Sequence, residues 1–325
     1  MRRETIAMIT DVRFQIEANE SGARARRIAL ALLLCLVLWF YYSSIDGAFR
    51  RPSTAAFTAP PFIATEVASA IGASWQAVSV TSGDGTSLSG WLFRPALPNG
   101  SSVLLMHETG GTRLNMLPDV KWLLRRGFTC LTPDGRGHGQ SGGKLVTAGL
   151  LEGADVVRWV HYLREEQGAG AIFGLGHSLG ASSLIHGLAL GAGLSRIVAD
   201  STGANVPTRY ALLAERYHMA SGRARPLLWL LVEPVLWNAQ WRYGVNLRSI
   251  SPVDWVRSVH APVLLVHGDH DWFIPIEEAR RIRDASPAWV SLWEVSGAGH
   301  VTAANQRPAE YQRVVLAWFD QEPTY

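Results

Sequence analysis

The sequence contains very little cysteine and very little lysine. Its two cysteines, Cys35 in an apolar stretch and Cys130 in an expected strand, can build neither a disulfide framework nor a thiolate-based metal site. Of the 30 basic side chains only Lys121 and Lys144 are lysines, and the arginines form no stripe interleaved with aromatic residues. With a net charge of only +3, this distribution argues against nucleic acid as a partner.

What the sequence does contain is enough apolar material for a large core. Hydrophobic residues make up 48% of the 325 residues and charged residues 18%, which is typical of globular proteins and slightly apolar for a soluble one. A chain of this length holds either one large domain with an appendage or two ordinary domains.

A charged N-terminal segment is followed by a long apolar run. Residues 1–27 carry six arginines, and no charged residue occurs between Ile28 and Ile45. As a helix those 18 residues would span about 27 Å, just enough for a bilayer core. The aromatic cluster Trp39–Tyr42 lies near the far end, where interfacial rings are found. We therefore predict a transmembrane signal-anchor helix over 28–45.

The arginines on the N-terminal side also predict the orientation of this single-pass membrane anchor. By the positive-inside rule the segment 1–27 is cytoplasmic, and everything after Ser43 lies outside the cytoplasm. Two alternatives fit less well. A cleaved signal peptide would have a shorter leader and an A-x-A cleavage site after the apolar run. A buried helix of a globular domain would be amphipathic, whereas this run is apolar all round.

Residues 46–74 are predicted to be a linker between the membrane and the domain over 75–325, because they are rich in Pro, Ala, Ser and Thr. From residue 75 onward, strand and helix patterns alternate, beginning with a hairpin pattern across Gly83–Gly85. The expected strands are 75–81, 88–93, 102–107, 128–133, an apolar run from 171, 196–200, 262–267 and 290–295. The expected helices are 115–126, 150–166, 181–190, 276–284 and 308–319.

This alternation predicts an α/β fold with a mostly parallel sheet and helices on both faces. In such sheets the active residues collect on loops at the carboxyl ends of the strands. Residues 204–260 interrupt the alternation, since they carry no strand signal but do contain Leu227–Val232, Trp237 and Trp241. The segment is predicted to be a helical lid with an apolar underside, and an ordinary pair of core helices is the alternative.

One short stretch suggests the chemistry. Gly176-His177-Ser178-Leu179-Gly180 follows an apolar run and precedes a helical segment rich in small residues, which is the G-x-S-x-G context of a nucleophile elbow. Glycines on either side remove the Cβ atoms that would collide at so tight a corner. A serine hydroxyl at neutral pH still needs a base, and the base needs an acid that orients it.

Candidates for both partners follow later strands. Asp271 lies in the loop His267–Pro275 after the strand 262–267, and His300 ends the loop Gly297–His300 after the strand 290–295. Both loops are therefore expected at the same sheet edge as Ser178. The chain order Ser178, Asp271, His300 is the order expected of this type of elbow.

With these motifs the chain from about Trp75 to Trp318 resembles an α/β-hydrolase of the branch that contains serine aminopeptidase-like enzymes and monoacylglycerol lipases. Asp134–Gly142 is similar to the family's D-x-R-G-x-G-x-S segment, and Ala261–Gly268 to its P-V-L-x-x-H-G strand. The resemblance implies Ser178 as nucleophile, Asp271 as orienting acid and His300 as general base.

The family also implies where the oxyanion donors lie. One is the backbone N–H of Leu179, and the other follows an H-G pair in relatives, which aligns with Thr109 here. Glu108 stands where relatives have glycine, and a carboxylate near an oxyanion would repel it. We expect Glu108 to point to solvent or to pair with an arginine such as Arg113.

Several other residues remain alternatives. Asp269 is a rival acid, although the family's H-G-x-x-D spacing selects Asp271, and Asp200 ends a strand where some hydrolases keep their acid. His177 is expected to pack beside the elbow. The lone motif Asp269-His270-Asp271 is a weak metal signal. The remaining histidines are expected to be structural or to lack a partner: His107, His138, His267, His186 and His218.

The sequence thus predicts a membrane-anchored serine hydrolase that cleaves an ester, thioester or amide through an acyl-enzyme, without a metal or organic cofactor. The expected partners are a membrane and a small-molecule ester, acyl or short peptide substrate. A serine aminopeptidase is the alternative within the class. A catalytically silent hydrolase fold that acts as a binding protein is the alternative outside it.

Overall fold

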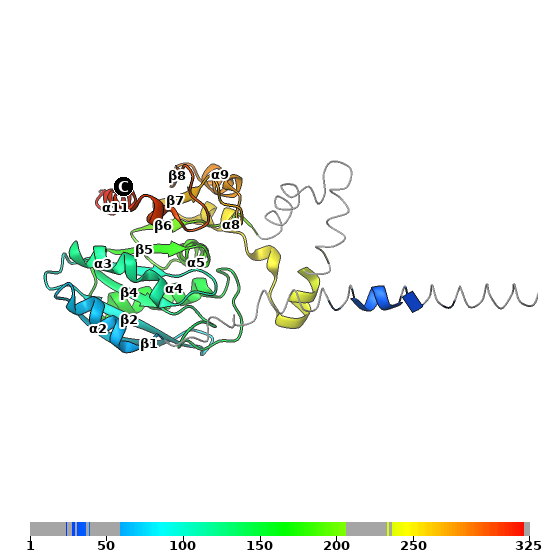
Figure 1. Cartoon of the computed structure of the whole chain (residues 1–325), viewed down its shortest axis with the longest axis horizontal. Coiled ribbons are helices and arrows are strands. Elements are labelled where there is room, and N and C mark those ends of the chain that lie inside the picture. Colours follow the sequence, from blue (N-terminus) through cyan, green and yellow to red (C-terminus); the bar gives the residue numbers. More distant parts are fainter. Residues whose placement is uncertain are drawn as a thin grey trace, which may run out of the picture. The chain divides into compact units, whose positions relative to one another are not determined.

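The computed structural model describes residues 59–205 and 236–321, together with Arg24, residues 28–29 and 31–36, Trp39 and Glu233. Contacts divide the chain into a unit over residues 1–48 and a unit over residues 49–325 (Figure 1). Most of the predicted segment 1–27 and residues 30, 37–38 and 40–45 lie outside the described residues. Those that are described between residues 28 and 39 are helical and exposed. Across the described parts of the chain, no helix is long and apolar enough to cross a membrane.

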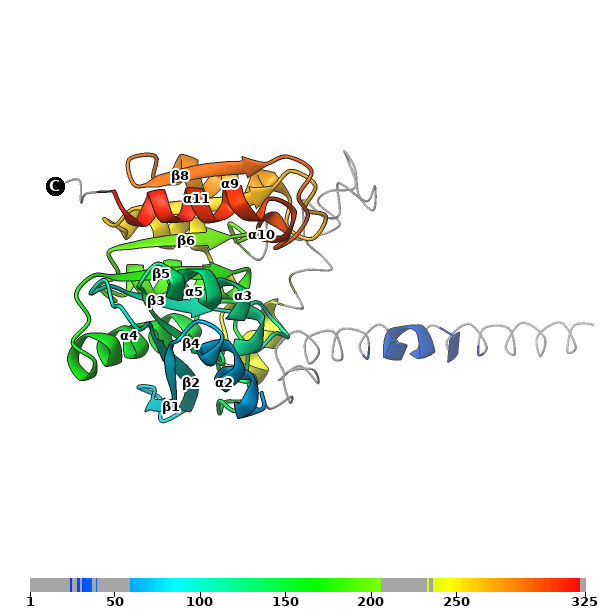
Figure 2. The same cartoon turned by 60° about the vertical axis from the view of Figure 1, so that its left-hand side comes forward.

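The second unit is built on one eight-stranded sheet with the order β1-β2-β4-β3-β5-β6-β7-β8, which Figure 2 shows from β1 at the bottom to β8 at the top. β1 pairs antiparallel with β2, and β2 antiparallel with β4, whereas every later neighbour is parallel. The predicted α/β fold with a mostly parallel sheet is therefore confirmed. The strands are β1 (Ser74–Thr81), β2 (Ser87–Arg94), β3 (Ser102–Met106), β4 (Thr129–Pro133), β5 (Ile172–His177), β6 (Arg196–Asp200), β7 (Val263–Gly268) and β8 (Val290–Val295).

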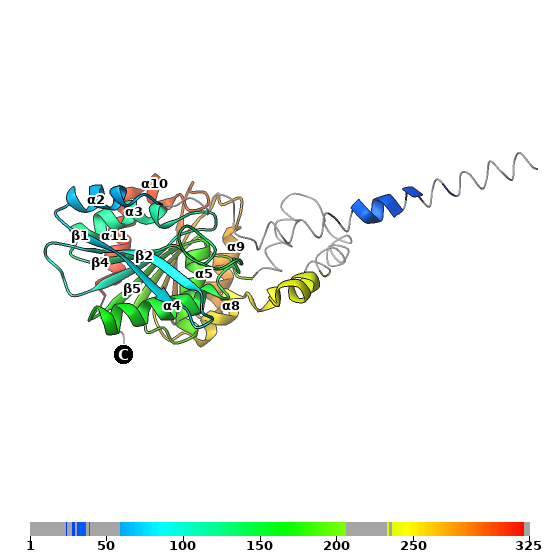
Figure 3. The same ribbon diagram turned by 90° about the horizontal axis from the view of Figure 1, so that it is seen from below.

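Helices cover both faces of this sheet (Figure 3). On one face lie α4 (Glu152–His161), α5 (Leu179–Ala189), α8 (Pro252–Trp255) and α9 (Ile276–Ala285). On the other lie α2 (Pro61–Ser69), α3 (Leu117–Arg125), α10 (Ala303–Gln306) and α11 (Pro308–Phe319). The short turns are η2 (Arg113–Met116), η3 (Tyr162–Glu166), η5 (Leu247–Ser249) and η6 (Val256–Ser258).

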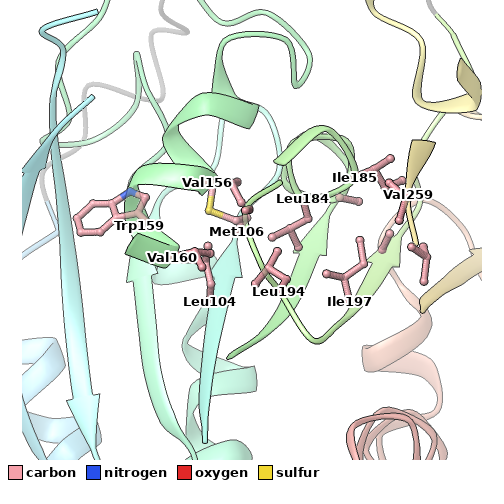
Figure 4. Close-up of a cluster of buried hydrophobic side chains, with 14 of the residues drawn as sticks. Leu104, Met106, Val156, Trp159, Val160, Leu184, Ile185, Leu194, Ile197 and Val259 are labelled. Atoms are coloured by element: carbon pink, nitrogen blue, oxygen red, sulfur yellow. The ribbon is translucent and has the colours of Figure 1, made fainter. Parts of the chain in front are cut away.

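Each face of the sheet has its own apolar core. β3 shows why, because Leu104 and Met106 point to the α4 and α5 face while Val103 and Leu105 point to the α3 and α11 face. The first core is drawn in Figure 4, where the side chains of β3, α4, α5 and β6 meet. A central strand that is buried on both sides reads as a continuous apolar run, as β3 does.

The predicted linker over 46–74 is too long. Residues from Ala59 onward belong to the second unit, since Ala59, Ala64 and Val67 are buried in its second core and α2 packs on β1. Pro61 stands at the start of α2, where proline is favoured because its missing N–H would have no helical partner. Proline here begins a helix rather than a flexible connection. Residues 46–58 lie outside the described residues.

The predicted lid over 204–260 is also too long at its carboxyl end. Val253, Val256 and Val259 are buried in the first core, and Trp255 stacks on His186 of α5. Residues 252–259 therefore belong to the core of the second unit rather than to a lid. Residues 206–232 lie outside the described residues, and the described part of 204–260 is free of strands and includes a helix over 236–243.

Candidate active site

The elbow at Ser178 connects the end of β5 to the start of α5. Ser178 has φ 51° and ψ −104°, a backbone conformation that is disfavoured for residues other than glycine. A Cβ at Gly176 would lie 2.5 Å from the carbonyl carbon of Gly180, and one at Gly180 would lie 2.1 Å from the carbonyl oxygen of Met106. Both glycines are therefore required by close backbone contacts.

Ser178, His300 and Asp271 form one chain of hydrogen bonds. His300 Nε2 lies 3.0 Å from Ser178 Oγ, and His300 Nδ1 lies 2.7 Å from Asp271 Oδ2. A carboxylate only accepts, so Nδ1 carries the proton and Nε2 is free to accept from the serine hydroxyl. The structure thus brings together the three residues that the sequence singled out.

Asp271 is held rigidly in this position. Its side chain is buried, and its Oδ1 accepts hydrogen bonds from the backbone N–H groups of Phe273 and Ile274, each at 2.8 Å. The other oxygen, Oδ2, faces His300. His267 lies close by, but its Nε2 donates to the carbonyl oxygen of Ile274 at 2.8 Å.

The two rival acids are bonded elsewhere. Asp269 accepts from Gly297 N and His270 Nδ1, both at 2.7 Å, and these bonds lower the pKa of its carboxyl. Asp200 Oδ1 accepts from the hydroxyl of Ser201 at 2.9 Å. Only Asp271 lies within hydrogen-bond distance of the His300 ring among the described carboxylates.

His177 and His186 make no hydrogen bond to the Asp271–His300–Ser178 chain. His177 is buried beside Asp119, with 3.7 Å between His177 Nε2 and Asp119 Oδ2, and burial raises the pKa of Asp119. His186 stacks on Trp255, and His218 lies outside the described residues. The described residues include no group of three potential ligands that could hold a metal ion, and so Asp269-His270-Asp271 does not form one.

The loop after β3 borders an open hollow of about 440 Å³, lined by residues 108–112, Leu114 and Asn115. Within the described chain, the N–H groups of Thr109 and Leu179 are bonded to no acceptor. Leu179 is the first residue of α5, so its N–H has no helical partner. Both predicted donors are thus free to bind an oxygen.

Of the two alternatives expected for Glu108, exposure to solvent or pairing with an arginine such as Arg113, the pairing with Arg113 is wrong. Glu108 Oε1 accepts from Asn115 Nδ2 at 2.6 Å, and the side chain folds back over Gly111. Arg113 is fully buried and donates instead to Asp134 Oδ2 at 2.6 Å. Its Nη2 also donates to Ser89 Oγ at 2.9 Å, whereas Nε and Nη1 are buried without a hydrogen-bond partner among the described residues, so the salt bridge compensates the buried charge only in part.

Two histidines hold this loop against the loop after β4. Gly135 N donates to His107 Nε2 at 2.9 Å, and Gly110 N donates to His138 Nε2 at 3.1 Å. The Nδ1 atoms face the carbonyl oxygens of Glu108 and Arg136, at 2.7 and 2.9 Å, which keeps the proton on Nδ1. Burial, with the neighbouring His138, lowers the pKa of His107 to about 4, so this ring stays neutral.

Sequence reasoning expected His107 and His138 to be structural but missed this reciprocal pairing. The sequence did carry a signal for this pairing. His107 directly follows β3, and His138 lies in the glycine-rich turn after β4, the strand next to β3 in the sheet. Which glycine each ring would reach could not be read without the loop conformations.

Comparisons with known proteins place most of the second unit in a hydrolase family. The profile described as the alpha/beta hydrolase family matches residues 103–314. The uncharacterized protein YfhR of Escherichia coli is 27% identical over 254 residues, which cover 75% of this chain and 81% of YfhR. The esterase Pf2001 of Pyrococcus furiosus is 25% identical, with a TM-score of 0.64 over 79% of this chain and 94% of the esterase. The acylaminoacyl peptidase of Pyrococcus horikoshii is 17% identical, with a TM-score of 0.58 over 78% of this chain and 42% of the peptidase.

Proposed function

The chain belongs to the alpha/beta hydrolase family, and we propose that it is a serine hydrolase which cleaves a carboxylic ester or thioester through an acyl-enzyme. The observation that carries this proposal is the unbroken hydrogen-bond chain from Asp271 through His300 to Ser178. A neutral imidazole in contact with a serine hydroxyl and a buried carboxylate is the arrangement that activates serine for acyl transfer.

In the proposed reaction His300 Nε2 takes the proton of Ser178 as Oγ attacks the substrate carbonyl carbon. Asp271 stabilises the imidazolium that forms, and the N–H groups of Leu179 and Thr109 stabilise the oxyanion. The carbon–oxygen or carbon–sulfur bond then breaks, and His300 gives its proton to the leaving group. Water then attacks the acyl carbon as His300 takes one of its protons, the bond between that carbon and Ser178 Oγ breaks as His300 returns the proton to Oγ, and the carboxylic acid leaves. A dehalogenase would have a carboxylate at the position of Ser178.

Aromatic side chains beside His300 favour a substrate with an apolar part. The ring of Phe273 lies edge-on to the His300 ring with 5.1 Å between centroids, and Trp272 lies edge-on to Phe273 at 5.9 Å. Both are exposed, Phe273 by 40% and Trp272 by 65%. Large exposed rings next to a reacting histidine provide apolar surface for an acyl chain or a lipid-like alcohol. The likeness to an esterase of Pyrococcus furiosus also favours an ester.

A serine aminopeptidase remains the alternative within this class, since the same groups would cleave an amide. The alternative of a catalytically silent binding protein rested on Glu108. Asn115 Nδ2 donates to that carboxylate at 2.6 Å, which holds it in place but leaves its charge, so labelling by a fluorophosphonate probe decides between an enzyme and a binding protein.

We also propose that the hydrolase domain is anchored to a membrane by the segment 28–45 and lies on the extracytoplasmic side. The described apolar residues of that segment support this, because Leu32, Leu36 and Trp39 each expose more than half of their surface within the chain. Exposed apolar side chains on a helix fit a lipid environment. A reporter fused after Tyr325 should give an extracytoplasmic signal, and a cytoplasmic signal would reverse the orientation.

A fluorophosphonate probe tests the proposed chemistry directly. The folded wild-type protein should be labelled, and the Ser178→Ala variant should not be. A panel of p-nitrophenyl esters of graded chain length, measured beside aminopeptidase substrates, separates ester from peptide cleavage. Absence of labelling in folded wild-type protein would overturn the proposal of a serine enzyme.

A further inference from the structure

Three strained residues meet at the carboxyl edge of the sheet. Among the described residues, the non-glycine residues with positive φ are Ala148, Ser178, Ser201 and Val301. Ser178 follows β5, Ser201 follows β6 with φ 60°, and Val301 follows His300 in the loop after β8 with φ 54°. This conformation is especially unusual for a β-branched residue such as Val301, so other contacts must hold it in place.

The hydroxyl of Ser201 connects these three loops. It accepts a hydrogen bond from Val301 N at 3.0 Å and donates one to Asp200 Oδ1 at 2.9 Å. The carbonyl oxygen of Asp200 in turn accepts from Ser178 N at 2.8 Å. Ser201 is itself fully buried, and its own N–H donates to Val266 of β7 at 2.9 Å. The nucleophile loop and the histidine loop are therefore tied to the same two residues.

The bond to Val301 acts on the base through the backbone. The N–H of Val301 belongs to the peptide group that follows His300, so fixing this group fixes ψ of His300 as well as φ of Val301. Those angles set the direction from which the imidazole reaches both Ser178 and Asp271. The bond that the Ser201 hydroxyl donates to Asp200 Oδ1 keeps the hydroxyl oxygen turned toward Val301.

We propose that Ser201 is a positioning residue, whose hydroxyl holds the peptide group after His300 so that the imidazole stays aligned between Asp271 and Ser178. This inference rests on the proposed serine-hydrolase function. Ser201 touches neither His300 nor the Ser178 hydroxyl through a hydrogen bond of its own, and it therefore acts only through Val301 and Asp200.

Ser201→Ala tests the proposal, and Ser182→Ala is its matched control. Ser182 of α5 is also buried, and its hydroxyl bonds that of Thr202, the neighbour of Ser201, at 2.8 Å. Each variant thus removes one buried hydroxyl, which makes two hydrogen bonds in Ser201 and one in Ser182, but only Ser201→Ala frees the histidine loop. Small misplacements of a catalytic group cost up to about 100-fold, so we expect Ser201→Ala to lower kcat for a p-nitrophenyl ester roughly 10- to 100-fold. KM should stay within about threefold, because ground-state binding is not touched.

Ser182→Ala should lose a similar amount of thermal stability but keep kcat within about twofold of wild type.

A second variant distinguishes an effect on the alignment of His300 from an effect on the stability of the protein. Glycine adopts positive φ without strain, so Val301→Gly combined with Ser201→Ala should recover part of the lost kcat. Equal losses of kcat in Ser201→Ala and Ser182→Ala, or wild-type kcat in Ser201→Ala, would overturn the proposal.

An NMR measurement distinguishes failure of this inference from failure of the proposed function. The Nδ1 proton of His300 that bonds Asp271 should give a low-field resonance, identified by its absence from a His300→Ala variant. We expect this resonance to shift or broaden in Ser201→Ala and to persist in Ser182→Ala. If the resonance changes in Ser201→Ala but the wild-type protein hydrolyses no substrate, the proposed enzymatic function is rejected and the positioning role of Ser201 is retained. An unchanged resonance in Ser201→Ala would reject the positioning role.

Discussion

Replacement of Asp271 by asparagine is the sharpest test of the candidate active site. The substitution keeps the size of the side chain and changes one oxygen to an NH₂ group. The structure decides which atom goes where. Oδ1 of Asp271 accepts from two backbone N–H groups, those of Phe273 and Ile274. An NH₂ group cannot accept, so the carbonyl oxygen of Asn must stay in that position and the NH₂ must face His300.

The consequence reaches Ser178 through the tautomer of His300. An NH₂ group at the position of Oδ2, 2.7 Å from His300 Nδ1, can only donate, so Nδ1 must lose its proton. The ring proton then moves to Nε2, which can no longer accept from the hydroxyl of Ser178. For triads of this kind the loss in kcat is on the order of 10⁴-fold. That factor corresponds to about 5 kcal/mol of transition-state stabilisation.

The assay is hydrolysis of a p-nitrophenyl ester, with thermal unfolding measured in parallel. Asp271→Asn should keep its fold, since the backbone N–H groups retain their acceptor. Asp269→Asn serves as the control, because Asp269 is bonded to Gly297 and His270 rather than to His300, and its kcat should stay within about threefold. A loss below about tenfold in Asp271→Asn, or an equal loss in Asp269→Asn, would refute the assignment of the acid.

Two further predictions concern the framework of the site. Gly180→Ala should lower the free energy of unfolding in urea by roughly 3 kcal/mol or more, because the new Cβ would lie 2.1 Å from the backbone oxygen of Met106; an unchanged midpoint would contradict this contact. Since the pKa of His107 is about 4 in the folded protein and 6.5 ordinarily, its neutral ring contributes stability that is fully present above pH 6.5 and lost as the pH falls through 4. His107→Gln keeps a hydrogen-bond acceptor but cannot titrate, so its free energy of unfolding should fall less than that of wild type between pH 6.5 and 4. Equal falls in the two proteins would argue against a lowered pKa of His107.

The periodicity of the chain predicted the secondary structure well wherever an element was long or buried. The expected ranges for β6, β8 and α11 coincide with the observed ones, because their apolar patterns reflect burial on one or both faces. α2 was missed, since its nine residues begin at the second of two adjacent prolines and include the small side chains that also mark linkers. Burial of Ala64 and Val67 against β1 and β2 decides the helix, and such contacts cannot be read from local composition.

The candidate site divides in the same way. The residues Ser178, Asp271 and His300, their order and their positions after strands followed from the sequence and from a family resemblance. Their catalytic roles, and the roles of Leu179 and Thr109, remain predictions. The pairing of Glu108 was wrong because Arg113, which is close in sequence, is drawn into the interior by Asp134.

The sequence by itself determined the fold class and the glycine-flanked serine, because periodicity and close backbone contacts impose local requirements on residue type. Only the tertiary structure decided which carboxylate bonds the His300 ring and what holds the histidine loop. Those contacts join residues 29, 122 and 100 positions apart, for Asp271–His300, Ser178–His300 and Ser201–Val301. They depend on the neighbouring order of β5, β6, β7 and β8, which brings the carboxyl ends of these strands to one edge of the sheet.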